Sequence, residues 1–347
     1  MRLMTYRDAL QTALAQAMEE DPGVIVMGIG VDDHKAVFGS TKDLVRRFGP
    51  QRVFDTPIAE GGMTGVAIGA ALGGLKPVHI HIRCDFLYLA MDQLLNLAAK
   101  WRSMFGGRMS VPLVVRAVIG RSWGQGAQHS QSLQSFMMHV PGIKVAMPTT
   151  PYDAQGLLLA AIADPNPVFL LEHRLLYELT GEAPDECRAV PFGQTVVRRE
   201  GDDVTIVANS YMAVEALRAA EVLSGYGIQA EVVDPVSLAP MDDTTILNSV
   251  RKTGRVVIVD TSWITCGVSA EIAAVVAEKA FEALKAPIKR LGMQRTVCPV
   301  SKPLERAFYP HAGTIVAEVL DLLGERRPES GVTETAISSK GPLKEPF

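Results

Sequence analysis

Residues 52–71 read RVFDTPIAEGGMTGVAIGAA, and they set out the first unit of the fold. The short apolar run at 52–55 predicts a strand. The Gly, Ala, Val and Ile residues after Glu60 predict a helix that packs closely on its neighbours. A carboxylate at this junction is costly to bury unless something uses it. We therefore interpret Glu60 as a candidate for proton chemistry. The alternative is a carboxylate that caps the helix or pairs with an arginine.

The same alternation of short apolar and longer amphipathic runs continues along the chain. Several apolar runs are continuous and β-branched, which is typical of strands buried on both faces. The alternation predicts an α/β fold with parallel sheets. We expect strands at 24–27, 77–82, 112–119, 144–147, 168–172, 204–208, 230–234 and 255–260. We expect helices at 6–20, 92–101, 151–163, 212–223, 243–252 and 269–284.

The chain divides into two parts at a polar, irregular stretch near 175–200. Its 347 residues are long enough for two ordinary domains. We expect one α/β domain over 1–185 and a second, self-contained βαβ series over 200–325. Periodicity is lost beyond that point, so we interpret 326–347 as a flexible tail or an arm laid on a partner.

Composition excludes several classes of function. Hydrophobic residues make up 48% of the chain, which excludes global disorder, and the net charge of −4 gives no attraction to nucleic acid or anionic membranes. No apolar run reaches the roughly 20 residues of a membrane span. The first eight residues lack the apolar core of a signal peptide. Four scattered cysteines indicate neither a zinc site nor a disulfide framework. We expect a cytoplasmic protein with reduced thiols.

A second candidate for chemistry is His129, in the run GQGAQHSQ at 124–131. The run follows the strand expected at 112–119, so His129 should emerge at the carboxyl end of a parallel strand, where ligands bind in open α/β sheets. A histidine there can donate or accept a proton near neutral pH. A helix-capping or core histidine is the alternative.

His79 and His81 share one face of a strand that we expect to be closed by Phe86, itself a core residue. Two histidines on one face could suggest a metal pair. We do not expect a metal there, because no further ligand lies at a suitable spacing. The sequence also has no GxxxxGK[ST] run and no strand–GxGxxG–helix unit, which argues against nucleotide binding.

Together these segments resemble the β subunit of the thiamine-diphosphate-dependent E1 component of 2-oxoacid dehydrogenases, a family related to transketolase. The resemblance covers about residues 3–323. It implies a pyrimidine-binding N-terminal domain, a transketolase-like C-terminal domain, decarboxylation of a 2-oxo acid such as pyruvate, and acyl transfer to a lipoyl group. It is carried by FGP at 48–50, RVFDTPIAE at 52–60, DQ at 92–93 with AAKWR at 98–102, GAQHSQS at 126–132, PGIKV at 141–145, DPNPV at 164–168 and KTGR at 252–255.

The resemblance also implies roles for single residues. In such enzymes a glutamate hydrogen-bonds N1′ of the cofactor's aminopyrimidine ring and favours the imino tautomer, and Glu60 has that position. Phe86 and Ile58 would lie against the cofactor, where an aromatic face suits a planar ring. His129 matches the histidine that faces the substrate or the lipoyl arm.

A structural potassium site is implied as well. The family builds it mainly from backbone carbonyls, and the matching residues here are Ala161, Ile162, Asp164 and Asn166.

One element of the superfamily is missing from this chain. The sequence has no Gly-Asp-Gly followed by an Asn-Asn pair, the element that holds Mg²⁺ and the diphosphate. We therefore expect an α subunit to hold both, an active site at the α/β interface, and an α₂β₂ assembly that serves a lipoyl-bearing E2 acyltransferase. The chain alone should neither bind thiamine diphosphate tightly nor turn over.

The sequence departs from the family near the expected substrate site. Residues 80–86 read IHIRCDF where the family has EFMTFNF, and 121–123 replace small glycine-rich residues. Arg83 and Arg121 could hold a carboxylate or phosphate by charge-assisted hydrogen bonds, and His81 could contact a sugar hydroxyl. Alternatively, these residues only reshape the subunit interface.

Two other functions stay open at this point. One is a split transketolase-like enzyme that moves a two-carbon ketol unit between sugars, for which a sugar substrate would be the cue. The other is a structural partner without cofactor chemistry, and the presence of Glu60, Phe86 and His129 argues against it.

Overall fold

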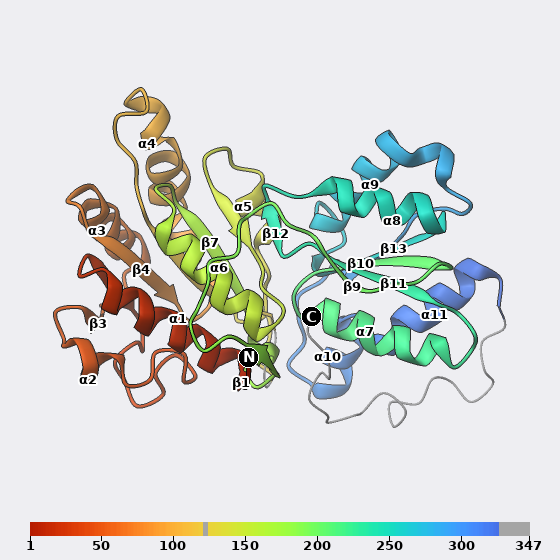
Figure 1. Cartoon of the computed structure of the whole chain (residues 1–347), viewed down its shortest axis with the longest axis horizontal. Helices are drawn as coiled ribbons and strands as arrows, with labels where there is room; N and C mark the ends of the chain where they lie inside the picture. Colours follow the sequence, from red (N-terminus) through yellow and green to blue (C-terminus); the bar gives the residue numbers. More distant parts are fainter. Residues whose placement is uncertain (121–123, 326–347) are drawn as a thin grey trace.

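The computed structural model describes residues 1–120 and 124–325, which form two α/β lobes side by side (Figure 1). The tail expected at 326–347 lies outside the described residues. The first lobe is built on a seven-stranded sheet with the order β12-β6-β7-β5-β4-β2-β3, and the second on a five-stranded sheet with the order β14-β13-β10-β11-β9. Helices cover these mostly parallel sheets, so the predicted α/β fold is confirmed.

The first sheet has a core of strands that run parallel to one another. Every residue of its strands β2, β5 and β7 is buried. This explains their continuous apolar sequences, because helices cover both faces. The parallel strands are β2 (Val24–Gly28), β3 (Val53–Asp55), β4 (Lys76–His81), β5 (Val114–Ile119), β6 (Lys144–Ala146) and β7 (Val168–His173).

Two helices pack against each other on one face of this sheet, α1 (Tyr6–Glu20) and α6 (Pro151–Ala163). Each begins with a threonine cap. The Thr5 hydroxyl accepts from the Asp8 N–H, and Thr150 forms a capping box with Asp153. The other face of the sheet is covered by the helical segments that position the candidate site. These are α3 (Glu60–Leu72), the 3₁₀ helix η1 (Cys84–Ala90), the π-helical η2 (Asp92–Ala98), α4 (Ala99–Met104) and α5 (Gln134–Met138). The short helix α2 (Leu44–Phe48) lies just before β3 in the chain.

The second lobe repeats the layered plan around its smaller sheet. Helices α7 and α11 pack together, as do α8 and α9. Its strands are β9 (Val196–Arg199), β10 (Val204–Ala208), β11 (Ala230–Asp234), β13 (Val256–Trp263) and β14 (Lys289–Met293). Its helices are α7 (Tyr211–Ser224), α8 (Asp243–Thr253), α9 (Val268–Ala280), α10 (Lys302–Phe308) and α11 (Ala312–Leu323), with a short 3₁₀ turn at η4 (Phe281–Ala283). The other short 3₁₀ turn, η3 (Arg174–Leu176), follows β7 in the first lobe.

The second half of the chain is not the self-contained series that the sequence predicts. Its short strand β12 (Ser237–Ala239) leaves the second lobe and pairs antiparallel with β6 at the edge of the first sheet. A small antiparallel ribbon, β1 (Arg2–Thr5) with β8 (Thr180–Ala183), was also missed. Both pairings join segments far apart in sequence, so local patterning does not reveal them.

Two predicted elements differ in detail. The strand expected to close at Phe86 ends at His81, and Phe86 lies in η1. The segment expected as a helix at 92–101 is helical, but its first part has π geometry, and Leu97 within that part is 37% exposed. A π turn holds more residues than an α turn, which shifts the side chains that follow.

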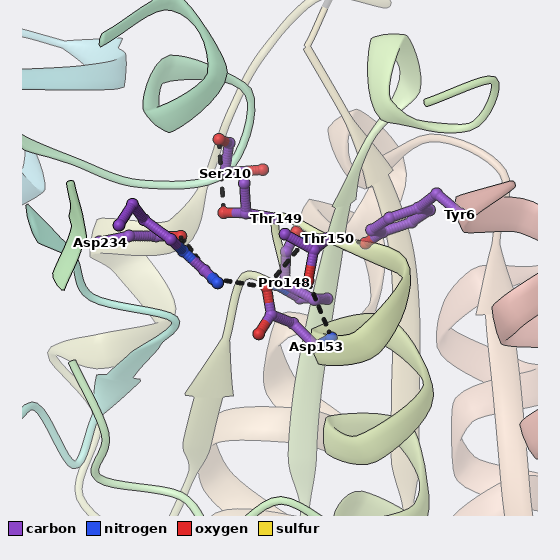
Figure 2. A network of polar contacts seen from close by, with 8 residues as sticks. Tyr6, Pro148, Thr149, Thr150, Asp153, Ser210 and Asp234 are labelled. Atoms are coloured by element: carbon purple, nitrogen blue, oxygen red, sulfur yellow. Dashed lines mark hydrogen bonds and ion pairs between the residues drawn. The ribbon is translucent and has the colours of Figure 1, made fainter. Parts of the chain in front are cut away.

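Buried polar contacts join the two lobes (Figure 2). The Arg198 guanidinium of β9 lies 2.5 Å from Asp153 of α6 and 2.9 Å from Asp234 of β11. The Thr149 hydroxyl donates to the Ser210 carbonyl, 3.4 Å away. Within residues 1–120 and 124–325, no helix is both long and apolar enough to cross a membrane.

Candidate active site

Glu60, Phe86 and His129 follow the carboxyl ends of three strands of the first sheet. Glu60 comes after β3, Phe86 after β4 and His129 after β5. These strands run parallel within the row β5-β4-β2-β3, so their carboxyl ends lie along one edge. Ligands bind at this edge in open α/β sheets.

Glu60 is the first residue of α3, and it is 8% exposed. The preceding Ala59 provides no side-chain cap. Among the described parts of the chain, no hydrogen-bond donor and no cation is paired with the Glu60 carboxylate. The sequence left open that Glu60 pairs with an arginine, and no arginine among these residues does so. The carboxylate retains only the helix N-terminus, which favours negative charge.

The start of α3 is pressed against η1. A Cβ atom at Gly61 would lie 2.8 Å from the Leu89 carbonyl oxygen and 3.4 Å from Gln93 Oε1. Only glycine allows this approach, because real Cβ contacts are not that short. The glycine after Glu60 thus brings the carboxylate next to the helix that carries Phe86.

The structure brings Phe86 and His129 together. Their ring centroids are 5.2 Å apart, with the planes at 74°, an edge-to-face arrangement. Both side chains are half-buried, so each keeps an open surface. Two of the predicted site residues, from segments 43 positions apart, therefore share one wall of the site.

Arg83 holds the loop that carries His129. Its Nη2 donates to the carbonyl oxygens of Gly120 and His129, and its Nε lies 3.4 Å from Asp85 Oδ2. Asp85 Oδ1 in turn accepts from the Gln131 N–H at 3.0 Å. Because Arg83 is 4% exposed, its guanidinium is engaged inside the protein. Arg121, the other arginine considered as a substrate ligand, lies outside the described residues.

His81 is also inside the protein, 3% exposed, beside His79 at 2%. Their ring centroids are 4.2 Å apart. Burial lowers the pKa of His79 to about 4, and burial together with His79 lowers the pKa of His81 well below its usual range. Both rings are therefore neutral at pH 7. Within the described ranges, no group of three or more His, Cys, Asp or Glu side chains is arranged to hold a metal ion.

The loop after α6 contains the residues expected at a potassium site. The Asp164 carboxylate pairs with the Lys144 ammonium and accepts from the Asn166 N–H at 2.9 Å. The Asp164 N–H donates to the Ala161 carbonyl at 3.2 Å. An ammonium group already neutralises this carboxylate, so any potassium ion would rely on backbone carbonyls, Ile162 among them. The potassium site stays a prediction.

Large apolar side chains lie exposed on the elements around Glu60. Ile58 is 81% exposed, Leu89 65%, Val66 54% and Tyr88 43%. These four residues, called here the rim patch, come from the residues before α3, from α3 itself and from η1. Contiguous exposed apolar surface is typical of a protein interface.

Sequence reasoning missed three residues that shape this edge. Asp55 Oδ1 accepts from the Val31 N–H at 2.7 Å and so holds the loop after β2. Asp85 anchors Gln131, as described above. The Tyr309 hydroxyl, from the second lobe, donates to the Ser130 carbonyl at 3.0 Å. The sequence does offer a clue to Asp85, because it lies close to Arg83 just after an apolar strand. It offers no clue to Tyr309, because the partner of Tyr309 lies 179 positions away.

The chain matches two protein families. Residues 2–180 match the family described as transketolase, pyrimidine binding domain, and residues 193–315 match transketolase, C-terminal domain. The β subunit of acetoin:2,6-dichlorophenolindophenol oxidoreductase from Bacillus subtilis (strain 168) is 43% identical over 336 residues, which span 93% of this chain and 98% of that protein. The mitochondrial pyruvate dehydrogenase E1 component subunit β-2 from Oryza sativa subsp. japonica is 44% identical over 317 residues, which span 90% and 84%.

Solved structures show the same fold. A split-gene transketolase, described as an inactive β₄ tetramer, superimposes with a TM-score of 0.76 at 24% identity and covers 93% of this chain and 99% of its own. A transketolase from Leishmania mexicana gives a TM-score of 0.67 at 18% identity and covers 93% and 46%.

Proposed function

Because this chain belongs to the family of pyruvate and acetoin dehydrogenase E1 β subunits, with transketolase pyrimidine-binding and C-terminal domains, we propose that it forms half of a thiamine-diphosphate-dependent active site. The reaction is decarboxylation of a 2-oxo acid such as pyruvate. The observation that carries the proposal is Glu60, a carboxylate 8% exposed and without a partner in the described chain. The ketol-transfer alternative rests on fold likeness alone.

The residues present fit the pyrimidine half of the cofactor. The Glu60 side chain is 8% exposed, and its carboxylate oxygens still reach solvent. No described residue donates to them, so they are free to accept a hydrogen bond from a ligand that enters the site. Phe86 adds an aromatic surface, and the exposed Ile58 adds an aliphatic one next to Glu60. Such surfaces suit a planar ring that carries N–H groups along its edge. Thiamine diphosphate, when bound, supplies a carbon nucleophile for the substrate carbonyl.

Each residue then has a separate task. The Glu60 carboxylate would accept a hydrogen bond from the ring nitrogen. Phe86 and Ile58 pack on the ring and exclude water. His129 gives or takes a proton near neutral pH on the substrate side. Arg83 and Asp85 hold the His129 loop by its main chain, and Arg83 acts as a positioning residue.

The other half of the site comes from a partner. The sequence lacks the Gly-Asp-Gly…Asn-Asn element, and the described residues contain no metal-binding cluster. We therefore assign Mg²⁺ and the diphosphate to an α subunit in an α₂β₂ assembly, seated on the rim patch. A lipoyl-bearing E2 acyltransferase is the proposed acceptor of the acyl group.

Cofactor binding tests this division of the site. The chain is expressed alone and together with an α-type chain that contains the missing element, and thiamine diphosphate is titrated into each by calorimetry with Mg²⁺ present. The chain alone should show no tight binding and no turnover, whereas the complex should show both. Full activity of the isolated chain with a 2-oxo acid would contradict the proposal.

A further inference from the structure

We propose that the second lobe positions the catalytic loop of the first: Tyr309 holds His129 in register by hydrogen-bonding the carbonyl of Ser130. This inference rests on the proposed role of His129. Tyr309 would act on His129 through the main chain, as a positioning residue.

Four main-chain groups at 129–131 have hydrogen-bond partners among the described residues, three of them from the first lobe and one from the second. Arg83 holds the His129 carbonyl, and Asp85 holds the Gln131 N–H. The Gln131 carbonyl accepts from Cys84 Sγ at 3.2 Å and from the Gly120 N–H at 3.3 Å. The Ser130 carbonyl alone receives its donor from the second lobe, the Tyr309 hydroxyl at 3.0 Å.

The same loop also packs against the second lobe just before His129. Gly124 and Gly126 both have φ = +71°, and the chain passes close to Val300. A Cβ atom at Gly126 would lie 2.7 Å from Val300 Cγ2, and one at Gly124 would lie 3.0 Å from the Val300 carbonyl oxygen. Glycine is needed here for both reasons, the positive φ and the close approach.

Tyr309 is itself fixed in place. Its ring is 4% exposed and meets Phe308 edge-to-face, with centroids 4.9 Å apart. These two residues form a small core with Met293 and Cys298, separate from the main cores of both lobes. The hydroxyl therefore reaches the Ser130 carbonyl from a rigid base.

Loss of this hydroxyl would leave the Ser130 carbonyl buried without its donor from the second lobe. The loop would then relax, and His129 would move relative to Phe86. Proton transfer depends steeply on such geometry. Glu60 and Phe86 belong to other segments, so cofactor binding should be insensitive to the same change.

Tyr309→Phe in the assembled complex tests the inference, because it removes the hydroxyl and keeps the ring. We expect amide hydrogen exchange at 124–131 to rise and kcat to fall about fivefold to tenfold, as for the loss of one buried hydrogen bond. Thiamine diphosphate affinity should stay within about twofold. The matched control is Tyr6→Phe, which removes a hydroxyl that donates to the Pro148 carbonyl at 3.3 Å and should change none of these.

A double-mutant cycle with His129→Ala tests whether Tyr309 affects turnover through His129. If Tyr309 acts through His129, adding Tyr309→Phe to His129→Ala should lower kcat no further. Independent, multiplying effects would overturn the inference, as would unchanged exchange at 124–131. If His129→Ala alone leaves turnover intact, the proposed role of His129 fails, and the exchange measurement still decides whether Tyr309 holds the loop.

Discussion

Two buried glutamates of the first lobe have opposite surroundings. Glu172 of β7 is 1% exposed, and it accepts from Arg116 Nε at 2.5 Å, from Arg116 Nη2 at 2.9 Å and from the Tyr177 hydroxyl at 2.5 Å. Glu60 is nearly as buried, yet no described residue donates to it. Glu172 lies within β7, which has a strand on each side, whereas Glu60 follows the end of the edge strand β3.

The difference separates structural from functional charge. Burial opposes the charge of Arg116, but the attraction of Glu172 outweighs it and raises the pKa of Arg116. Burial and Glu172 together raise the pKa of Tyr177. Arg116, Glu172 and Tyr177 pair with one another inside the protein, which makes Glu172 part of the fold. No residue within 1–120 or 124–325 donates to Glu60, so its carboxylate stays available to a ligand.

The largest expected effect on stability is at Glu172, the glutamate that has partners. Arg116→Met leaves Glu172 buried without its cation, which should lower the free energy of unfolding by about 3–5 kcal/mol. Denaturant titration followed by circular dichroism measures this loss. The double variant Arg116→Met/Glu172→Leu should recover most of it, because no buried charge remains. A single variant as stable as the parent would remove the basis of the comparison.

An intermediate case is Asp234 of the second lobe, which pairs with Arg198, the residue that also contacts Asp153 of the first lobe. Burial raises the pKa of Asp234 from 3.8 to about 6, although Arg198 acts to lower it. The folded chain then holds this proton more tightly than the unfolded chain. The stabilising contribution is therefore fully present near pH 4 and is lost as the pH rises toward 6.

The Asn side chain in the variant Asp234→Asn cannot ionise. The unfolding free energy of the variant minus that of the parent should therefore increase by about 1–3 kcal/mol between pH 4 and pH 6 and stay constant at higher pH. Thermal unfolding in a series of buffers measures this slope. Glu221→Gln, at a side chain that is 80% exposed, is the control and should give a flat difference. A flat difference for Asp234→Asn as well would show that its pKa is not raised.

The smallest expected effect on the isolated chain is at the rim patch. Ile58→Ala should change the free energy of unfolding by no more than about 0.5 kcal/mol, because the side chain is 81% exposed. Assembly with the α subunit should weaken by about 1–2 kcal/mol if Ile58 becomes buried there. Analytical ultracentrifugation compares it with Leu3→Ala, an aliphatic residue 61% exposed on β1, which should assemble normally.

The sequence predicted the parallel strands well because their signal is local. The apolar runs at β5, β10 and β11 are buried along their whole length, and the Thr150–Asp153 cap appears in the residues themselves. Glu60 was also identifiable, because a carboxylate before a small-residue helix is unusual enough to need an explanation.

The sequence did not predict what depends on distant partners. Arg116 lies inside an apolar run, and its partner Glu172 is 56 positions away. The crossing strand β12 has three residues and no pattern of its own. Arg83 was interpreted as a possible substrate ligand, because its contacts with the Gly120 and His129 carbonyls have no trace in the sequence.

Glu60→Gln tests the central claim most directly, when stability of the chain and turnover of the assembled complex are measured on the same variant. Glu60 loses no partner among the described residues, so the free energy of unfolding should stay within about 0.5 kcal/mol of the parent. Turnover should fall about 10²- to 10⁴-fold with assembly intact. A variant that keeps its turnover, or one that loses several kcal/mol of stability as Arg116→Met should, would contradict the account.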